Sequence, residues 1–541
     1  MTEVASLRPL AAVGVSAIAI LGILAAHRRP NLREGVTLVA AACKFAIVAS
    51  MLPGVLDGTV YVTNLGELVA GIPFALRADA LGLLFALLAS LLWIPTSLYS
   101  IGYMRGLGEE NQTRYFASFA GALSATMGIA FAPNLVVLFV FYELLTVSTY
   151  PLVAHDETEE ARAAGRKYLA YTFGGGVAVL AGTVLVYVAA GTVTFSAGGI
   201  EGLTAGAGTN VARLAFALLA GGFAVKAAVM PLHSWLPDAM VAPTPVSGLL
   251  HAVAVVKSGA FGLSRVVLDV FGPEAVAEVG AGVPLAAVAV FTFIVASVIA
   301  LRKDNLKRRL AYSTIAQLSY IVMGLALLKP TALVGGLLHI PAHAFMKLTL
   351  FFCAGAIHVE THTDRISEMA GIGKRMPLTM AAFGLASLGM AGMPLLAGFV
   401  SKWYLLAGSF SAGQTVFALA LLLSGVLNIA YFWPVVYQAF FETREESDQK
   451  PVVDAEIGGY WGRVPDHYTP GAAVADGGDD AHSHEEGWRR VGLRGGEASP
   501  FVLAPILVAV GGAVAIGIAP ATVYFFRIVR LVVENATGVA V

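Results

Sequence analysis

Charged residues are scarce in this sequence. Asp, Glu, Lys and Arg make up 13% of the 541 residues, whereas hydrophobic residues make up 57%. The mean hydropathy is +0.77. This composition excludes an ordinary soluble domain, in which about a quarter of the residues are charged. The formal net charge of −1 gives no reason to expect a nucleic acid as partner.

Cysteine is also rare. The two cysteines, Cys43 and Cys353, lie in separate apolar runs. Two isolated thiols exclude a disulfide framework and a cysteine-ligated cluster or zinc ion. The sequence likewise offers no ligand pattern for flavin, haem or iron–sulfur centres. We therefore expect this chain to hold no cofactor and no metal ion.

Long apolar runs, in contrast, recur along the whole chain. Runs of about 20 residues match the roughly 30 Å hydrocarbon core of a bilayer. The first run ends at His27 without a small-residue cleavage pattern, so we interpret it as a span and not as a signal peptide. The sequence predicts an all-α integral membrane protein with about 14 spans, at residues 10–26, 36–53, 77–103, 113–131, 134–154, 168–190, 211–230, 244–270, 281–301, 308–328, 331–357, 377–408, 415–440 and 500–526.

Lysine and arginine accumulate in alternate loops, for example at Arg302 and Lys303. Because basic loops stay in the cytoplasm, we expect a multi-pass protein of the cell membrane with both termini on the non-cytoplasmic side. Residues 442–499 are polar, acidic and Gly-rich, and we expect a flexible cytoplasmic loop there. The histidines of this loop match no metal-ligand spacing.

Five lysines and one glutamate lie within the apolar runs: Lys44, Glu143, Lys226, Lys257, Lys347 and Lys402. A charge at such a depth costs at least about 2.5–3.5 kcal/mol, so it persists where it is paired, hydrated or needed. One interpretation is that each lysine reaches the interface or makes one structural ion pair, and we favour it for Lys44. For the other lysines we favour a proton path, because a buried lysine loses its proton readily and a nearby carboxylate restores it.

Histidines extend this series of titratable groups. His339, His343 and Lys347 are spaced at i, i+4 and i+8, which places them on one stripe of a helix. His251 lies six residues before Lys257 on another span. A lone histidine on an apolar helix is usually a core residue with satisfied hydrogen bonds. Three titratable groups on one stripe instead favour a proton relay.

Two charged spans also contain helix breakers. Pro231 follows Lys226, and Pro394 precedes Lys402. Proline removes a backbone hydrogen bond, and such breaks are tolerated at membrane depth only where protein or water meets the freed groups. Broken spans at corresponding places in two halves are typical of an inverted repeat with an ion path at the midplane. An ordinary kink is the alternative.

Several long motifs closely resemble the antiporter-like subunits of Mrp-type cation/proton antiporters and respiratory complex I. They are KAAVMPLHSWLPDAM (226–240), APTPVSGLLH (242–251), DNLKRRLAYSTIAQ (304–317), HAFMK (343–347) and GMPLLAGFVSK (392–402). The resemblance implies 14 helices with two inverted five-helix repeats, each containing a discontinuous helix. It implies the following division: N-terminal helices (1–112), first repeat (113–271), second repeat (272–441), polar loop (442–499) and last helix (500–541).

The resemblance also implies roles for single residues. Glu143 would form an ion pair with Lys226, Lys257 would bridge two half-channels, and Lys402 would serve the exit half. The hydrated axis between them would contain His251, His339, His343 and Lys347. His233 and Asp238, within the first motif, are secondary candidates.

The set of charged residues and the chain length look most like the D-type member of the Mrp antiporters. We therefore expect a proton-translocating subunit of a multi-subunit Na⁺/proton antiporter, with other membrane subunits as partners. A proton-pumping subunit of a redox complex, such as complex I or a membrane hydrogenase, is the alternative, in which the redox chemistry lies on other chains. A carrier of an organic solute or of inorganic carbon is a third class, and it would need a roomy midplane pocket.

Overall fold

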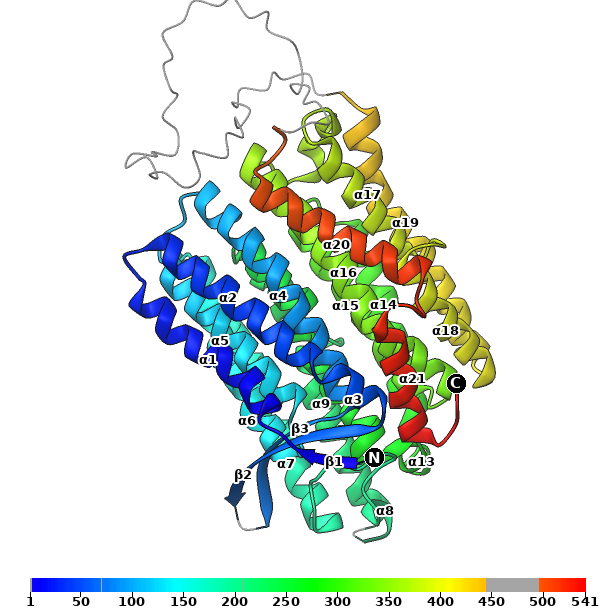
Figure 1. Cartoon of the computed structure of the whole chain (residues 1–541). Coiled ribbons are helices and arrows are strands. Elements are labelled where there is room, and N and C mark those ends of the chain that lie inside the picture. Colours follow the sequence, from blue (N-terminus) through cyan, green and yellow to red (C-terminus); the bar gives the residue numbers. More distant parts are fainter. Residues whose placement is uncertain (1, 70, 207, 444–495) are drawn as a thin grey trace, which may run out of the picture.

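The computed structural model describes residues 2–69, 71–206, 208–443 and 496–541, and most of them are helical (Figure 1). The helices are α1 (Arg8–Ala25), α2 (Pro30–Ala49), α3 (Leu52–Leu56), α4 (Ala80–Gly106), α5 (Gln112–Ala130), α6 (Leu135–Val153), α7 (Glu159–Ala190), α8 (Leu203–Gly206), α9 (Thr209–Lys226), α10 (Trp235–Asp238), η1 (Ala239–Val241), α11 (Thr244–Gly248), η2 (Leu249–Val253), α12 (Val255–Arg265), η3 (Val266–Val270), α13 (Gly272–Glu278), α14 (Gly282–Leu301), α15 (Leu306–Ala326), α16 (Pro330–Thr361), η4 (Ile366–Glu368), η5 (Ile372–Lys374), α17 (Pro377–Ala391), α18 (Ala397–Ser411), α19 (Thr415–Phe441), α20 (Pro500–Ile518) and α21 (Tyr524–Thr537).

Ten helical segments of the described chain are long and apolar enough to cross a membrane. Four further spans expected from the sequence coincide with α5, α9, α15 and the pair α17/α18, which are shorter, broken or more polar. Together these segments account for the 14 expected spans. The predicted all-α membrane fold is therefore confirmed.

A small sheet that the sequence did not predict lies at the end of the bundle that carries both termini (Figure 1). It contains β1 (Thr2–Ala5), β2 (Thr59–Val69) and β3 (Ile72–Ala78). β1 pairs with β2 in parallel, and β2 pairs with β3 antiparallel. At the opposite end of the bundle, α19 ends and α20 begins (Figure 1). The two termini thus share one side, and which side faces the cytoplasm stays a prediction.

The same order of helix contacts occurs twice along the chain. α5 packs on α6, α6 on α7, and α7 on α9; then α14 packs on α15, α15 on α16, and α16 on α18. In both series the fourth helix belongs to a broken span, because α9 stops at Lys226 before the short α10, and α17 is separated from α18. Thr244–Val270 is the fifth span of the first series, and α19 is the fifth span of the second. Because each series has an odd number of spans, the second series begins on the opposite side of the bundle from the first.

Both breaks contain a proline in a non-helical segment. Pro231 lies between α9 and α10, and Pro394 lies between α17 and α18, where Gly392 has a φ of 99°. A third irregular span is the one from Thr244 to Val270, in which the π-helical segments η2 and η3 flank α12. Such π segments arise where one extra residue is inserted into a helix, and they occur frequently at functional sites.

The C-terminal helices connect distant parts of the chain. α20 packs against both α4 and α16, and α21 packs against α4 and α16 as well. The expected last span, 500–526, ends earlier than predicted, at Ile518. Pro520 follows that helix, and α21 begins at Tyr524 with Phe525, Ile528 and Val532 on its buried face. The polar loop expected at 442–499 lies almost entirely outside the described residues.

Candidate functional site

The predicted proton path is carried mainly by the two spans that are most enclosed by protein. An 18-residue stretch of Thr244–Val270 and another of Pro330–Thr361 are completely buried, whereas in most other spans less than half of such a stretch is buried. The first span holds His251 and Lys257, and the second holds His339, His343 and Lys347. These five side chains are fully buried. Titratable groups are therefore concentrated where lipid does not reach.

Glu143 lies on α6 and faces α7. Both carboxylate oxygens are buried and have no hydrogen-bond partner among the described residues. A Cβ atom added to Gly176 of α7 would overlap Glu143 Oε1. The glycine therefore provides the space that the carboxylate occupies, and a buried acceptor without a partner is costly unless function or water requires it.

Lys226 is the last residue of α9, and it points back towards α6. Its Nζ donates a hydrogen bond to the Tyr142 carbonyl oxygen at 2.5 Å and lies 3.3 Å from the centroid of the Tyr142 ring. Tyr142 directly precedes Glu143 in the sequence. No ion pair between Lys226 and Glu143 occurs in the described part of the chain. In this structure the expected pair is thus open, with the lysine held by a carbonyl next to the acid.

We predict that Gly176→Ala reduces proton flux roughly tenfold to a hundredfold, because its methyl group displaces the Glu143 carboxylate. Gly174→Ala is the matched control, since a Cβ atom there has nothing within 4 Å. Both changes raise helix propensity equally, so a difference between them reports on Glu143. Flux is measured as the pH change inside vesicles that contain the assembled complex. Equal flux in the two variants would show that the carboxylate does not need this space.

Lys257 and His343 make the most direct contact between titratable groups in the two enclosed spans. Lys257 Nζ of α12 lies 2.8 Å from His343 Nδ1 of α16. The other nitrogen of that ring, His343 Nε2, is buried without a partner in the described structure. His339 follows on the same stripe of α16, with 6.0 Å between the two imidazole centroids. The contact between Lys257 and His343 therefore joins the span 244–270 to α16 of the second contact series.

A glutamine extends the cluster towards Lys402. His339 Nε2 lies 2.9 Å from Gln317 Oε1, and His339 Nδ1 lies 2.8 Å from Ser401 Oγ. Gln317 Nε2 in turn reaches the Met390 carbonyl oxygen at 3.5 Å. Lys402 Nζ donates to the same carbonyl at 2.7 Å. Polar side chains therefore follow one another from Lys257 to Lys402 through α16, α15 and the end of α17. His343 and His339 are neighbours in this row through a ring contact and not through a hydrogen bond.

Lys402 lies in the second turn of α18, and its side chain reaches across the break to the end of α17. Its Nζ donates to the carbonyl oxygens of Met390 and Ala391, which are left free at the C-terminus of α17. The partial negative charge of a helix C-terminus favours a cation at this place. A cavity of about 290 Å³ beside it is lined by apolar residues such as Leu421 and Trp403. The break thus creates the lysine site instead of merely bending a helix.

Several other predicted residues make their closest contacts with groups that do not belong to this row. Lys347 hydrogen-bonds the Leu310 carbonyl at 3.2 Å and Ser313 on α15, and His251 packs on Phe351 with both ring nitrogens unpartnered among the described residues. Lys44 donates to Ser16 Oγ and the Leu123 carbonyl at 2.5 and 3.0 Å. The secondary candidates lie apart as well, because Asp238 pairs with Lys167 at 2.6 Å and His233 is near Tyr312.

Sequence reasoning missed the uncharged polar residues that support this row. Gln317, Ser401, Tyr320 and Asn428 are all buried, and Asn428 hydrogen-bonds Tyr320 while accepting from Gln317. Tyr320 also lies under Lys402, 5.0 Å from Nζ to the ring centroid. The available signal was the presence of an amide side chain in the middle of an apolar helix, where it needs a partner.

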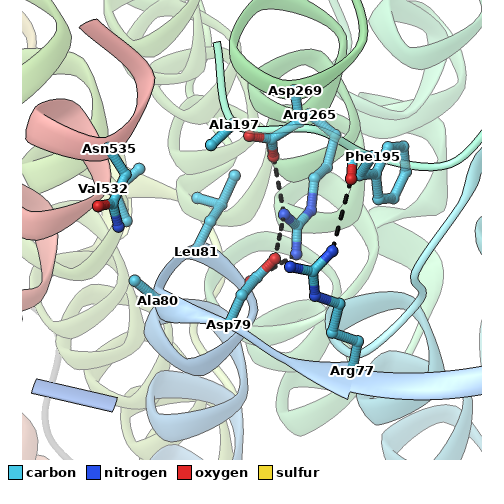
Figure 2. A pocket seen from close by; sticks show the side chains of 10 residues that line it. All are labelled: Arg77, Asp79, Ala80, Leu81, Phe195, Ala197, Arg265, Asp269, Val532 and Asn535. Atoms are coloured by element: carbon cyan, nitrogen blue, oxygen red, sulfur yellow. Dashed lines mark hydrogen bonds and ion pairs between the residues drawn. The ribbon is translucent and has the colours of Figure 1, made fainter. Parts of the chain in front are cut away.

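An ionic cluster around the buried Arg265 was also missed (Figure 2). Arg265 binds both carboxylate oxygens of Asp79, at 2.7 and 2.8 Å, and Asp269 at 2.7 Å. Asp79 also caps α4 by accepting from the Gly82 amide at 2.7 Å. Arg77 lies nearby and reaches the Phe195 carbonyl (Figure 2). The cluster therefore joins the start of α4 to the end of the irregular span 244–270.

We expect Arg265→Met to destabilise the protein by about 3–5 kcal/mol, because it leaves the buried Asp269 and the partly buried Asp79 without their ion-pair partner. Arg213→Met serves as control, since Arg213 is exposed and makes contacts to the Val279 carbonyl and to Asn210. The measurement is thermal unfolding of the purified protein in detergent. Equal unfolding temperatures for the two variants would contradict a stabilising role for this cluster.

Comparisons with known proteins agree with this architecture. The profile of the family described as NADH:quinone oxidoreductase/Mrp antiporter, TM matches residues 132–428, which is more than half of the chain. NADH-quinone oxidoreductase subunit N of Desulforudis audaxviator (strain MP104C) is 35% identical over 347 residues, covering 64% of this chain and 68% of that protein. The probable K⁺/H⁺ antiporter A/B subunit of Rhizobium meliloti (strain 1021) is 32% identical over 412 residues, covering 74% of this chain and 40% of that protein.

Two solved structures share the fold over nearly the whole chain. A chain of the Mrp complex from Dietzia sp. DQ12-45-1b superposes with a TM-score of 0.81 at 21% identity, covering 98% of both chains. A chain of the membrane-bound sulfane sulfur reductase, an archaeal respiratory membrane complex, gives 0.78 at 22% identity, covering 98% of this chain and 100% of that one. The profile, the identity to subunit N and the 14-span fold lead to one conclusion: this chain belongs to the NADH:quinone oxidoreductase/Mrp antiporter family of membrane subunits.

Proposed function

We propose that this chain is the proton-translocating subunit of a multi-subunit Na⁺/proton antiporter in the cell membrane. The observation that carries the proposal is the buried contact between Lys257 and His343, continued by His339, Gln317 and Lys402. Titratable groups within one buried row can exchange protons without making or breaking a bond in a substrate. Such rows within a membrane mark proton relays.

The proposed relay starts with the pair of Glu143 and Lys226. Lys226 rests on the Tyr142 carbonyl, one residue from the acid, so a change in its side-chain rotamer moves Nζ between the carbonyl and the carboxylate. Pairing with Glu143 keeps Lys226 protonated, and opening the pair releases the proton for the next site. Gln317 does not titrate, so it positions His339 and Lys402 relative to each other.

Three features support the Mrp type, and within it the D-type member. The chain aligns along 98% of its length with a chain of the Dietzia Mrp complex. Position 402 is a lysine, as in the D-type member that this chain resembles, whereas one complex I member of the family carries glutamate there. The set of Glu143, Lys226, Lys257 and Lys402, together with the chain length, also resembles the D-type member. We propose the family's two repeats at residues 113–271 and 272–441. Partner membrane subunits would then supply or share the path for the cation.

A subunit of a redox-driven proton pump is the second candidate. The identity of 35% to NADH-quinone oxidoreductase subunit N and the fold match to the sulfane sulfur reductase complex favour it. The relay chemistry within this chain would be the same. Only the source of energy and the partner chains would differ.

An ion-gradient experiment separates the two candidates. The intact complex is purified with its partner subunits and reconstituted into vesicles that contain a pH-sensitive dye. The antiporter proposal predicts that an imposed Na⁺ gradient alone changes the internal pH. A pH change that requires an electron donor and a quinone, and that Na⁺ alone does not produce, would reject the antiporter in favour of the redox pump.

A further inference from the structure

A cluster of metal-binding side chains lies outside the proton path, at one end of the bundle. Glu109 comes from the connection between α4 and α5, whereas His155 and Asp156 come from the connection between α6 and α7. One donor atom from each residue lies within 4.8 Å of the other two. Two separate connections therefore bring an imidazole and two carboxylates to one point.

The histidine is the most informative member of this cluster. His155 is only 3% exposed, and its Nδ1 atom is buried without a partner among the residues that the structure describes. A buried imidazole nitrogen without a hydrogen-bond partner is a common metal ligand in proteins. Arg114 fixes the backbone at this place, because it donates to the His155 carbonyl at 2.7 Å and pairs with Glu157.

Neither carboxylate of the cluster forms an ion pair within the described ranges of the chain. The neighbouring bases have other contacts, since Lys307 donates to the Ala242 carbonyl at 2.7 Å and His358 lies 2.9 Å from Asp364. A cavity of about 370 Å³ is lined by the three cluster residues together with Glu110, Asn111 and Glu157. The cavity has room for an ion with bound water.

We propose that Glu109, His155 and Asp156 bind one divalent transition-metal ion, with Zn²⁺ as the ion that fits best. One nitrogen and two oxygen ligands with a water in the fourth position is a donor set that Zn²⁺ accepts in proteins, whereas Mg²⁺ and Ca²⁺ prefer oxygen ligands alone. The ion would hold the α4–α5 and α6–α7 connections together. The sequence did not suggest this site, because its ligands belong to two separate connections.

Direct binding of Zn²⁺ to the intact complex tests the proposal. The purification tag is removed, bound metal is stripped with a chelator, and His467, His482 and His484 are changed to alanine so that they do not compete. Zn²⁺ is then titrated, and bound metal is counted by mass spectrometry. We expect one ion per chain, and we expect His155→Ala and Glu109→Gln to weaken binding by at least about tenfold, since even supporting residues of metal sites contribute this much.

The neighbouring carboxylate of Glu110 offers a matched control. Glu110→Gln changes a residue that lines the same cavity but is not among the three ligands, so it should bind Zn²⁺ as the parent does. X-ray absorption of the bound ion should show nitrogen and oxygen neighbours and no sulfur. The proposal is overturned if the parent binds no Zn²⁺, or if Glu109→Gln, in a complex that assembles normally, binds it with unchanged affinity.

Discussion

Lys257→Met is expected to reduce ion-driven proton flux by roughly 100-fold or more, the contribution of a well-placed proton-transfer group. Methionine keeps the length and apolar contacts of the lysine stem but removes the amine. His343 Nδ1 then loses its contact at 2.8 Å, and the proposed path is interrupted between Lys226 and His343. Flux is measured in vesicles that contain the intact complex, at equal protein content.

Lys44→Met is the control for this change. Lys44 is as buried as Lys257, but its Nζ contacts Ser16, Leu123 and the face of Trp93, 5.0 Å from Nζ to the ring centroid, and none of the predicted path residues. We expect Lys44→Met to retain flux close to that of the parent protein. Similar losses in the two variants would show that general damage to the bundle, and not the loss of a proton site, explains the effect of Lys257→Met.

Glu143→Gln is expected to lower proton flux by a similar factor, on the order of 100-fold. The amide keeps the shape of the side chain beside Gly176 but carries no charge, so the paired state proposed for Glu143 and Lys226 can no longer form. The flux assay is the same as for Lys257→Met, and the assembly of the complex is checked by gel filtration.

Glu143→Asp separates charge from shape in this region. Aspartate keeps the charge but shortens the side chain by one methylene, so part of the flux should remain. A Glu143→Gln variant with the same proton flux as the parent protein would contradict a protonatable role for this position. A variant with aspartate that is less active than the one with glutamine would mean that packing against α7 matters more than charge.

The membrane fold could be predicted because its signals are local in the sequence. Apolar runs of bilayer length define the spans, and lysines within them stand out because their insertion is costly. The stripe of His339, His343 and Lys347 follows from helix geometry alone, and these three residues do lie on one continuous helix, α16. Proline and glycine likewise marked the places where two spans are broken.

Partners across helices could not be predicted, because they depend on packing between segments far apart in the chain. No local pattern pairs Lys347 with Ser313, or His339 with Gln317 and Ser401. Whether Lys226 contacts the Tyr142 carbonyl or Glu143 depends on the rotamer of its side chain, which no sequence pattern specifies. The N-terminal sheet was missed for the same reason, since β1 pairs with β2 although the two strands are far apart in the sequence.

The most direct test of a single ordered path uses changes at its two ends, alone and combined. Glu143→Gln and Lys402→Met are each measured for ion-driven proton flux in assembled complexes, and then the double variant is measured. Groups that act in series are strongly non-additive, so the double variant should be no slower than the slower single variant. A double variant whose loss is the product of the two single losses, or Lys402→Met with full flux, would contradict the claim that these residues form one path.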